Sequence, residues 1–454
     1  MGKLFGTDGV RGVANKELTC ELAFDLGRAG AYVLTETKQK PKILIGKDTR
    51  ISCDMLEAAL CAGLTSVGAD VYLAGVITTP AIAHLVKSHG FDAGIMISAS
   101  HNPYEFNGIK FFNSQGFKLS DQIEEKIEDI ILNKKWDEVP HAQFDAIGRV
   151  NRVDLKKDYQ EYLKSTLDGA SFKGLKIVID CANGAAYKIA PQVFEDLGAE
   201  VVVINNQPDG TNINKECGST HLKMLQQEVV KNKADFGIAY DGDADRTLFV
   251  DEEGSIVDGD KIMLLLAQNL KQQGRLSRNT LVVTVMSNMG LFVAAKELGI
   301  DLEVTKVGDR YVLEKMLEGG YSIGGEQSGH IILLDFATTG DGILTSLQLT
   351  KLICQSGKKL SELAKVMKVY PQVLVNARVE NGKKDLYSKD PVILEAIKKV
   401  EEKLNGKGRV LIRPSGTEPL IRVMIEGEDY EEIKKDAEAL ASLIESRLSK
   451  KFLS

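Results

Sequence analysis

The sequence Phe236-Gly-Ile-Ala-Tyr-Asp-Gly-Asp-Ala-Asp-Arg-Thr-Leu-Phe-Val-Asp251 decides the fold of this chain. Apolar residues dominate both ends, and a polar loop with three aspartates separates them. The two apolar runs, Phe236–Tyr240 and Thr247–Asp251, have the length and composition of buried strands. The stretch therefore predicts a strand, a loop that carries three carboxylates, and a second strand.

The same pattern occurs at two other places in the chain. Its copies cover Ala93–Ser98, Ala99–Gly108 and Ile109–Phe112, and then Tyr321–Gly324, Gly325–His330 and Ile331–Leu334. A strand, a helix and a strand precede each copy, at 42–46, 55–67 and 70–74, at 175–180, 184–197 and 200–204, and at 280–284, 291–298 and 301–305. Such units imply right-handed crossovers and largely parallel sheets. Because the loop returns at the same place each time, we predict three similar α/β domains with mixed, largely parallel sheets.

The last part of the chain follows a different order. Its pattern is strand, helix, strand, strand, helix, at 373–379, 392–404, 409–413, 420–426 and 430–448. This order is typical of a compact α+β domain. At roughly 150 residues per domain, 454 residues allow about three domains, with wide error. We predict four domains, at 1–153, 154–255, 256–368 and 369–454.

Composition excludes several classes of protein. The net charge is −7 with Lys and Arg spread along the chain, so the concentrated basic face of a nucleic-acid binder is missing. Six cysteines without a CxxC pair suit neither a disulfide framework nor a zinc site, and favour free thiols in a reducing compartment. No apolar run approaches the roughly 18 residues of a membrane span, and no signal peptide is evident. We expect a cytoplasmic protein without membrane or nucleic-acid partners.

The acidic loop predicts a metal site. Asp241, Asp243 and Asp245 cannot lie close together without a cation, because like charges repel at short range. Carboxylate oxygens select Mg²⁺, Ca²⁺ or Mn²⁺. The alternatives are a merely solvated loop and an EF-hand calcium loop, but Arg246 occupies the glycine position of an EF-hand and the flanks read as strands. We therefore expect one Mg²⁺ at the end of a strand.

The first loop offers a nucleophile. In Gly94-Ile-Met-Ile-Ser-Ala-Ser-His-Asn-Pro103, a buried strand ends at a turn with Ser100 at its tip. A lone serine in a turn is usually structural, and its hydroxyl needs a base or a metal to react. If Ser100 carried a phosphoryl group, that group would complete the coordination of an ion held by the three aspartates. Lys110 is a candidate acid/base group or charge clamp for the same cleft.

Two further loops suggest ligand contacts. Gly324-Gly-Glu-Gln-Ser-Gly-His330 lets backbone approach a ligand, and Glu326 and Ser328 suit sugar hydroxyls, although a glycine-rich turn is often only structural. Arg413-Pro-Ser-Gly-Thr-Glu-Pro419 combines a guanidinium with a turn whose N–H groups form an anion nest, which predicts a phosphate-binding loop. Gly6-Thr-Asp-Gly-Val-Arg-Gly12 places Arg11 as a second phosphate contact, and Lys47-Asp-Thr-Arg50 offers more positive charge after the first strand.

The four loops, in this order, resemble the signature loops of the α-D-phosphohexomutase superfamily. The similarity spans nearly the whole chain, and the loop at 6–12 with the Glu-Gln of the third loop is most similar to the members that act on amino-sugar phosphates. It implies four domains around a central cleft, each giving one loop. One departure is Phe106, where relatives commonly have Asp before Asn-Gly.

The resemblance also assigns roles to individual residues. Ser100 matches the serine that carries the phosphoryl group and, with Asp241, Asp243 and Asp245, binds Mg²⁺. Lys110 matches the family's proposed acid/base lysine, and Arg11 an arginine near the phosphoserine; we add His101 as a catalytic candidate. The expected substrate-binding residues are Arg246, Glu326, Ser328, His330, Arg413, Ser415, Gly416, Thr417 and Arg422.

The implied reaction interconverts glucosamine 6-phosphate and glucosamine 1-phosphate and would feed UDP-N-acetylglucosamine and cell-wall synthesis. Glucosamine or glucose 1,6-bisphosphate would be the intermediate or activator. A mutase for glucose or mannose phosphates would use the same fold and site. A metal-dependent phosphatase that hydrolyses its phosphoserine is an alternative from another class, and a calcium-binding module is a distant one. A homodimer is what relatives suggest.

Overall fold

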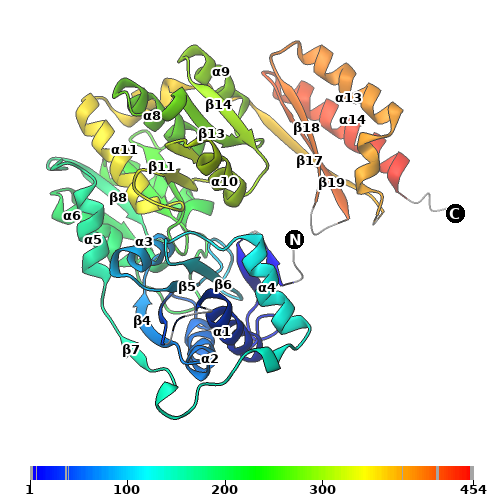
Figure 1. Ribbon diagram of the computed structural model, residues 1–454. Helices are drawn as coiled ribbons and strands as arrows, with labels where there is room; N and C mark the ends of the chain where they lie inside the picture. Colours follow the sequence, from blue (N-terminus) through cyan, green and yellow to red (C-terminus); the bar gives the residue numbers. More distant parts are fainter. Residues whose placement is uncertain are drawn as a thin grey trace. The chain divides into compact units, whose positions relative to one another are not determined.

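The computed structural model describes residues 4–6, 8–35, 38, 40–380, 382–415 and 419–449. Within these residues, the strands form four sheets (Figure 1). The strands are β1 (Phe5–Gly6), β2 (Gly9–Val13), β3 (Lys42–Lys47), β4 (Asp70–Val76), β5 (Ala93–Ile97), β6 (Phe106–Asn113), β7 (Val150–Arg152), β8 (Lys176–Asp180), β9 (Glu200–Ile204), β10 (Phe236–Tyr240), β11 (Thr247–Asp251), β12 (Ile256–Val257), β13 (Thr280–Thr284), β14 (Asp301–Thr305), β15 (Ile323–Gly325), β16 (Ile331–Leu333), β17 (Gln372–Arg378), β18 (Arg409–Pro414) and β19 (Leu420–Glu426).

The helices lie between these strands. They are α1 (Cys20–Thr35), α2 (Cys53–Ser66), α3 (Thr79–His89), α4 (Asp121–Leu132), α5 (Lys156–Ser165), α6 (Ile189–Asp196), α7 (Lys223–Asn232), α8 (Gly259–Gln272), α9 (Met289–Glu297), α10 (Asp309–Gly319), α11 (Gly342–Ser356), α12 (Leu360–Leu363), α13 (Pro391–Leu404) and α14 (Tyr430–Leu448). None of the helices in these ranges has the length and hydropathy that a membrane crossing requires.

Three sheets repeat one four-stranded core. The first contains β6-β5-β3-β4, the second β11-β10-β8-β9 and the third β16-β15-β13-β14. In each, three neighbouring strands run parallel and the fourth pairs antiparallel at one side. The predicted three similar α/β domains with mixed, largely parallel sheets are therefore confirmed. In every copy, the link between the last two strands is a predicted functional loop.

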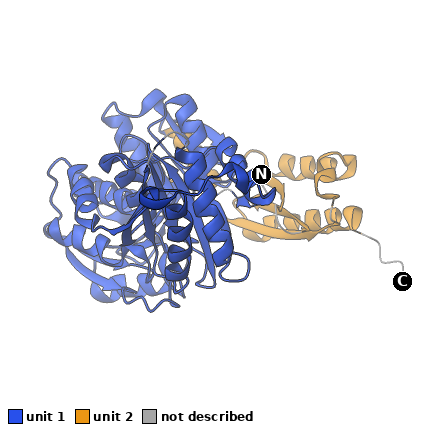
Figure 2. Ribbon diagram, turned by 60° about the horizontal axis from the view of Figure 1, so that its bottom comes forward, with its two compact units in different colours: residues 1–287, 298–366 blue, residues 288–297, 367–454 orange. Residues whose placement is uncertain are grey.

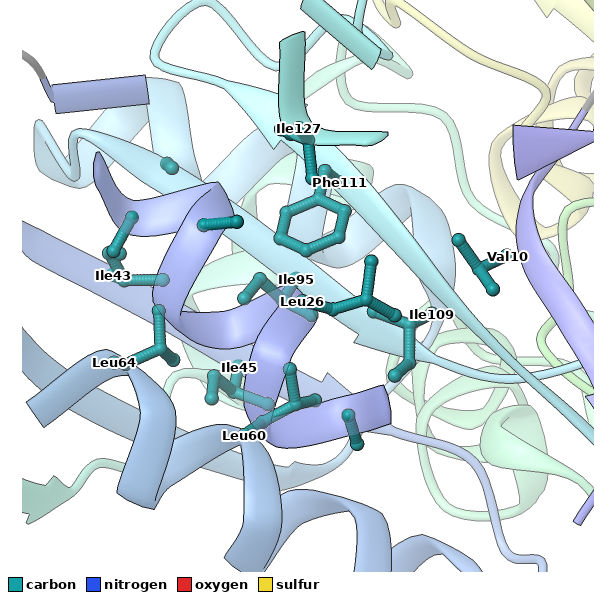
Figure 3. Packing of buried hydrophobic residues seen from close by; sticks show 14 of the residues in the cluster. Val10, Leu26, Ile43, Ile45, Leu60, Leu64, Ile95, Ile109, Phe111 and Ile127 are labelled. Atoms are coloured by element: carbon teal, nitrogen blue, oxygen red, sulfur yellow. The ribbon is translucent and has the colours of Figure 1, made fainter. Parts of the chain in front are cut away.

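The first sheet is wider than the other two. Strands β1 and β2 extend it beyond β6, and β7 extends it beyond β4. Helices α1, α2 and α4 cover one face, where Leu26, Leu60 and Ile127 pack against Ile95 and Phe111 (Figure 3). This packed core holds β5 and β6 in place, and so fixes the turn that joins them.

Two compact units can be distinguished by their internal contacts (Figure 2). The first comprises residues 1–287 and 298–366, and thus all three α/β sheets. The second comprises residues 288–297 and 367–454, with the antiparallel sheet β17-β19-β18, helices α13 and α14, and α9. The predicted α+β order of the C-terminal part is confirmed, while the four domain boundaries stay predictions.

One predicted helix is shorter than expected. The pattern predicts a helix over 184–197, but the α-helix begins at Ile189 and Ala185–Tyr187 form a 3₁₀ turn. The reason is Pro191, which has no backbone N–H to donate to the carbonyl four residues earlier, at Tyr187. Proline is tolerated in the first helical turn, so the α-helix begins just before it.

Candidate active site

The turn after β5 places Ser100 against the acidic loop after β10. Ser100 has a left-handed φ of 51° and is only 1% exposed. Its Oγ donates a hydrogen bond to Oδ2 of Asp241 over 2.6 Å. A left-handed conformation costs a non-glycine residue about 1–2 kcal/mol, so the surrounding contacts must compensate for it. The structure thus brings together the two loops that the sequence singled out.

The acidic loop forms a compact group of carboxylates. Asp241, Asp243 and Asp245 each offer an oxygen within 4.8 Å of the others, and all three side chains are buried. Burial raises the pKa of Asp241 well above its usual value, and the charges of Asp245 and Asp243 raise it further. Oδ1 of Asp243 and Oδ1 of Asp245 are buried without a hydrogen-bond partner among the described residues. Orphaned carboxylate oxygens at this spacing fit a divalent cation with oxygen ligands.

Lys110 on β6 lies beneath the carboxylates. A lysine on a strand most often lies solvated at the surface. In the structure, the side chain of Lys110 is buried. Its Nζ lies 2.8 Å from Oδ2 of Asp243, 3.0 Å from Asp8 and 3.5 Å from Asp245. Burial opposes its charge, but the carboxylates of Asp243 and Asp8 outweigh burial and raise the pKa of Lys110 above its usual value. Lys110 is therefore a charged clamp on the loop.

A cavity of about 560 Å³ opens beside the two loops. Predicted site residues line it from several elements: Arg11, His101, Asp245, Arg246, Glu326 and His330. Burial lowers the pKa of His101 to about 4, and the neighbouring charge of Arg246 contributes. A cavity of this size, with cations and carboxylates on its walls, suits a small, charged and hydroxylated ligand.

The third loop, between β15 and β16, contributes to this cavity. Oε1 of Glu326 accepts a hydrogen bond from the N–H of Gly308 over 3.0 Å. Nε2 of His330 accepts a hydrogen bond from the N–H of Gly340 over 3.1 Å. Nδ1 of the ring lies 3.7 Å from Asp245. Ser328, in contrast, is exposed and does not line the cavity, so its predicted contact with sugar hydroxyls stays a prediction.

The predicted phosphate loop belongs to the second unit. Arg413 on β18 lies directly opposite Arg422 on β19 in the antiparallel register. Burial lowers the pKa of Arg413, and the charge of Arg422 lowers it further. The N–H of Ser415 donates to the carbonyl of Leu420 over 2.9 Å. Gly416 and Thr417 lie outside the described residues. Two guanidinium groups on facing strands form a cationic surface suited to an anion.

Sequence reasoning missed an ion-pair network at the cavity wall. Asp8 accepts hydrogen bonds from Arg11 and Lys118 and lies beside Lys110. Lys118 also donates to Asp309 at the start of α10, and so links the first sheet to the third. Asp8 lies within the glycine-rich motif at 6–12, which gave a local signal. Lys118 and Asp309 give none, because their proximity arises only in the fold.

Comparison with protein families identifies the architecture. Four phosphoglucomutase/phosphomannomutase models match in chain order: α/β/α domain I at residues 2–138, domain II at 157–254, domain III at 258–370 and the C-terminal domain at 374–443. These matches define a phosphohexomutase, in agreement with the repeated sheets.

Curated relatives indicate which kind of phosphohexomutase this chain is similar to. A phosphoglucosamine mutase from Caldicellulosiruptor bescii is 96% identical over 99% of this chain and 100% of its own length. A phosphoglucosamine mutase from Acetivibrio thermocellus is 60% identical over 99% of this chain and 100% of its own length. The chain therefore belongs to the phosphoglucosamine mutases of the phosphohexomutase superfamily.

Solved structures share the fold. A phosphoglucomutase/phosphomannomutase family protein from Burkholderia thailandensis has a TM-score of 0.81 at 23% identity, covering 99% of both chains. An N-acetylphosphoglucosamine mutase from Aspergillus fumigatus, in complex with GlcNAc-6P and magnesium, has a TM-score of 0.71 at 18% identity. In that comparison 98% of this chain and 96% of the other are covered.

Proposed function

We propose that this chain interconverts glucosamine 6-phosphate and glucosamine 1-phosphate through a phosphorylated Ser100. The observation that carries the proposal is the 2.6 Å contact between Oγ of Ser100 and Asp241, within a buried group of three carboxylates. Its support from relatives is the phosphoglucosamine mutase activity named for proteins 96% and 60% identical. A serine alone in a turn would not suggest this chemistry, but a serine that faces such a group does.

In the proposed cycle, Oγ of Ser100 is first a leaving group and then an acceptor. The free hydroxyl of the sugar attacks the phosphorus and loses its proton, the bond from phosphorus to Oγ breaks, Oγ of Ser100 takes up a proton, and a 1,6-bisphosphate forms. After the sugar turns around, its other phosphoryl group moves back to Oγ. Phosphoryl transfer depends mainly on positioning and on charge neutralisation. Arg11 and Lys110 supply fixed positive charge for this purpose.

Asp241, Asp243 and Asp245, with a phosphoryl group on Ser100, would hold one Mg²⁺. The three carboxylates offer oxygens within 4.8 Å of one another, and two of their oxygens have no hydrogen-bond partner among the described residues. When bound there, the ion would neutralise charge on the transferring group. The magnesium bound by the Aspergillus fumigatus enzyme is consistent with this choice.

The remaining predicted residues would bind the sugar phosphate. Glu326, Ser328 and His330 would contact the sugar, with Arg246 and His101 at the same cavity. Arg413, Ser415, Gly416, Thr417 and Arg422 would hold the phosphate that does not react. Glucosamine or glucose 1,6-bisphosphate would serve as intermediate or activator. The homodimer and the cytoplasmic location stay predictions.

The test is a coupled assay of the purified chain with glucosamine 6-phosphate, Mg²⁺ and catalytic glucose 1,6-bisphosphate. We expect isomerisation, one phosphate adduct by intact mass, and loss of both in Ser100→Ala. Equal turnover of glucose or mannose phosphates would instead favour the broader mutase. Release of inorganic phosphate without isomerisation would favour the phosphatase, and an active Ser100→Ala would refute the phosphoserine route.

A further inference from the structure

Arg50, just after β3, is fully buried and directed at the Ser100 turn. Its Nε donates to Oδ2 of Asp48 over 2.8 Å. Its two terminal nitrogens donate to four backbone carbonyls, those of Ser100, Asn102, Pro103 and Phe106. A guanidinium has five N–H donors, so none is left for a phosphate. Of the positive charge that the motif Lys47-Asp-Thr-Arg50 offers, the charge of Arg50 is therefore used inside the fold and is not available to a ligand.

The partner of Arg50 supports the same turn from the other side. Oδ2 of Asp48 also accepts a hydrogen bond from Oγ of Ser98 over 2.7 Å. Oγ of Ser98 in turn accepts from the N–H of Ser100 over 2.9 Å. Both backbone polar groups of Ser100 are thus tied to one buried ion pair. This arrangement compensates for the left-handed conformation of Ser100.

Asn214 holds the turn from the second α/β domain. Its Nδ2 donates to the carbonyl of Ser100 over 2.8 Å and to that of Asn102 over 3.1 Å, the same two carbonyls that Arg50 binds. Asn214 is buried, has a φ of 58°, and is anchored by its N–H to the carbonyl of Ala182 over 2.9 Å. Asparagine adopts this left-handed conformation more readily than most residues.

The metal loop packs directly against the clamped turn. At Gly242, between Asp241 and Asp243, an added Cβ would lie only 2.5 Å from the carbonyl oxygen of Ser100 and 2.9 Å from Nδ2 of Asn214. The backbone of one loop therefore contacts the carbonyl that Asn214 and Arg50 hold. A shift of this carbonyl would change the distance between Oγ of Ser100 and Asp241.

We infer that Arg50 and Asn214 are positioning residues that clamp the Ser100 carbonyl and so fix Oγ of Ser100 against the three aspartates. Neither side chain touches the reacting atoms. Arg50 acts from within the domain of the serine, and Asn214 acts from the domain of the metal loop. Asn214 thereby sets the spacing between the two halves of the reaction centre. The inference rests on the proposed function of Ser100 as phosphoryl carrier.

The decisive variant is Asn214→Gly. Glycine accepts a φ of 58° without strain, so the substitution removes the two clamp hydrogen bonds and leaves the backbone and all five Arg50 bonds in place. Asn405→Gly is the matched control, because Asn405 also has a left-handed φ of 47° but lies exposed at the end of α13. Arg50→Lys is a second variant, which keeps the buried charge but supplies fewer, differently placed donors.

The full-length variants are assayed for kcat and KM with glucosamine 6-phosphate, and the phosphoserine is observed by ³¹P NMR. For Asn214→Gly we expect kcat to fall about 10- to 100-fold, as a misplaced reacting group does. KM should stay within about twofold, since the cavity walls are unchanged, and the ³¹P resonance should shift or broaden. Arg50→Lys should likewise lower kcat while KM stays nearly unchanged. Asn405→Gly should have the kcat and KM of the parent chain.

An unchanged kcat in Asn214→Gly would overturn the inference. So would a rise in KM equal to the fall in kcat with an unaltered ³¹P resonance, because that pattern indicates general loosening. Failure of the proposed function itself would look different, since the parent chain would then lack a phosphoserine resonance or isomerase activity.

Discussion

The Ser100–Asp241 region of the first unit and the Arg413–Arg422 region of the second use charge in opposite ways. Around Ser100, cations and carboxylates are interleaved and buried, as Lys110 shows between Asp243 and Asp8. On β18 and β19, two arginines face each other across the strands. Opposed like charges are unfavourable unless a counter-ion joins them. In the proposed function, the first region carries out the reaction and the second receives a phosphate.

The largest expected effect comes from breaking the first arrangement at Asp243. Asp243→Asn removes a negative charge from the carboxylate group and from the contact with Lys110, while keeping the shape of the side chain. Because several kcal/mol of charge stabilisation would be lost, kcat should fall roughly 10³-fold. The apparent affinity for Mg²⁺, measured by titration of activity, should fall as well.

Asp251→Asn is the matched control for this change. Asp251 is a buried aspartate of the same sheet, but its Oδ1 accepts hydrogen bonds from the backbone N–H groups of a turn, at Glu253 and Ser255. An asparagine oxygen can accept those bonds, so activity should stay within a few fold. Similar losses in both variants would mean that the acidic loop has no special electrostatic role.

Breaking the second arrangement should affect binding rather than turnover. Arg413→Gln removes one of the two facing cations from the loop proposed to hold the phosphate that does not react. A charge-assisted hydrogen bond contributes about 1.5–3 kcal/mol, so KM should rise about 10- to 100-fold, with kcat within a few fold. Initial-rate kinetics over a range of glucosamine 6-phosphate concentrations would measure both constants.

Lys407→Gln provides the comparison within the same unit. Lys407 is exposed and lies just before β18, at the end of that strand opposite to the loop between β18 and β19, and its loss should leave KM unchanged. A fall in kcat for Arg413→Gln without a change in KM would contradict the division between a reacting region and a binding region.

The sequence predicted the loops that carry a local signal. The strands around Ser100 and around the three aspartates were visible because buried strands leave uninterrupted apolar runs. Residues 236–240 and 247–251 form β10 and β11 with the predicted bounds. β6 begins at Phe106, three residues before the apolar run, because Asn107 and Gly108 pair with β2 although neither is apolar.

The contacts that connect the loops could not be predicted in this way. Lys118, Asp309 and Asn214 are single polar residues in unremarkable surroundings, and they meet their partners only when separate sheets come together. Arg50 belongs to a motif that the sequence marks by its positive charge, but the sequence does not reveal which carbonyls a buried guanidinium will meet. The local pattern identifies the reacting groups, whereas tertiary packing decides which side chains hold them.

The smallest expected effect concerns Asp341, a buried carboxylate that can be compared with the ion-paired carboxylates around Ser100. Asp341 caps α11, where its Oδ1 accepts from the N–H of Leu344, and its Oδ2 accepts from the hydroxyl of Tyr159. Burial raises the pKa of Asp341 to about 6, although these hydrogen bonds oppose the shift. Unlike Asp48, which has Arg50, this carboxylate forms no ion pair with the described residues, so its charge is costly in the fold.

Asp341→Asn should therefore stabilise the chain at neutral pH more than at acid pH. The folded state binds the proton more tightly than the unfolded state, whose pKa is 3.8, so this group's contribution to stability falls as pH rises from about 4 to about 6. The loss is about 3 kcal/mol at most, and asparagine keeps the cap. Thermal midpoints at pH 4.5 and pH 7.5 should differ less in the variant than in the parent chain, by a few degrees.

Asp429→Asn, at the exposed cap of α14, should not reproduce this change. Parallel pH profiles for Asp341→Asn and the parent chain would show that the buried carboxylate is stabilised in its charged form after all.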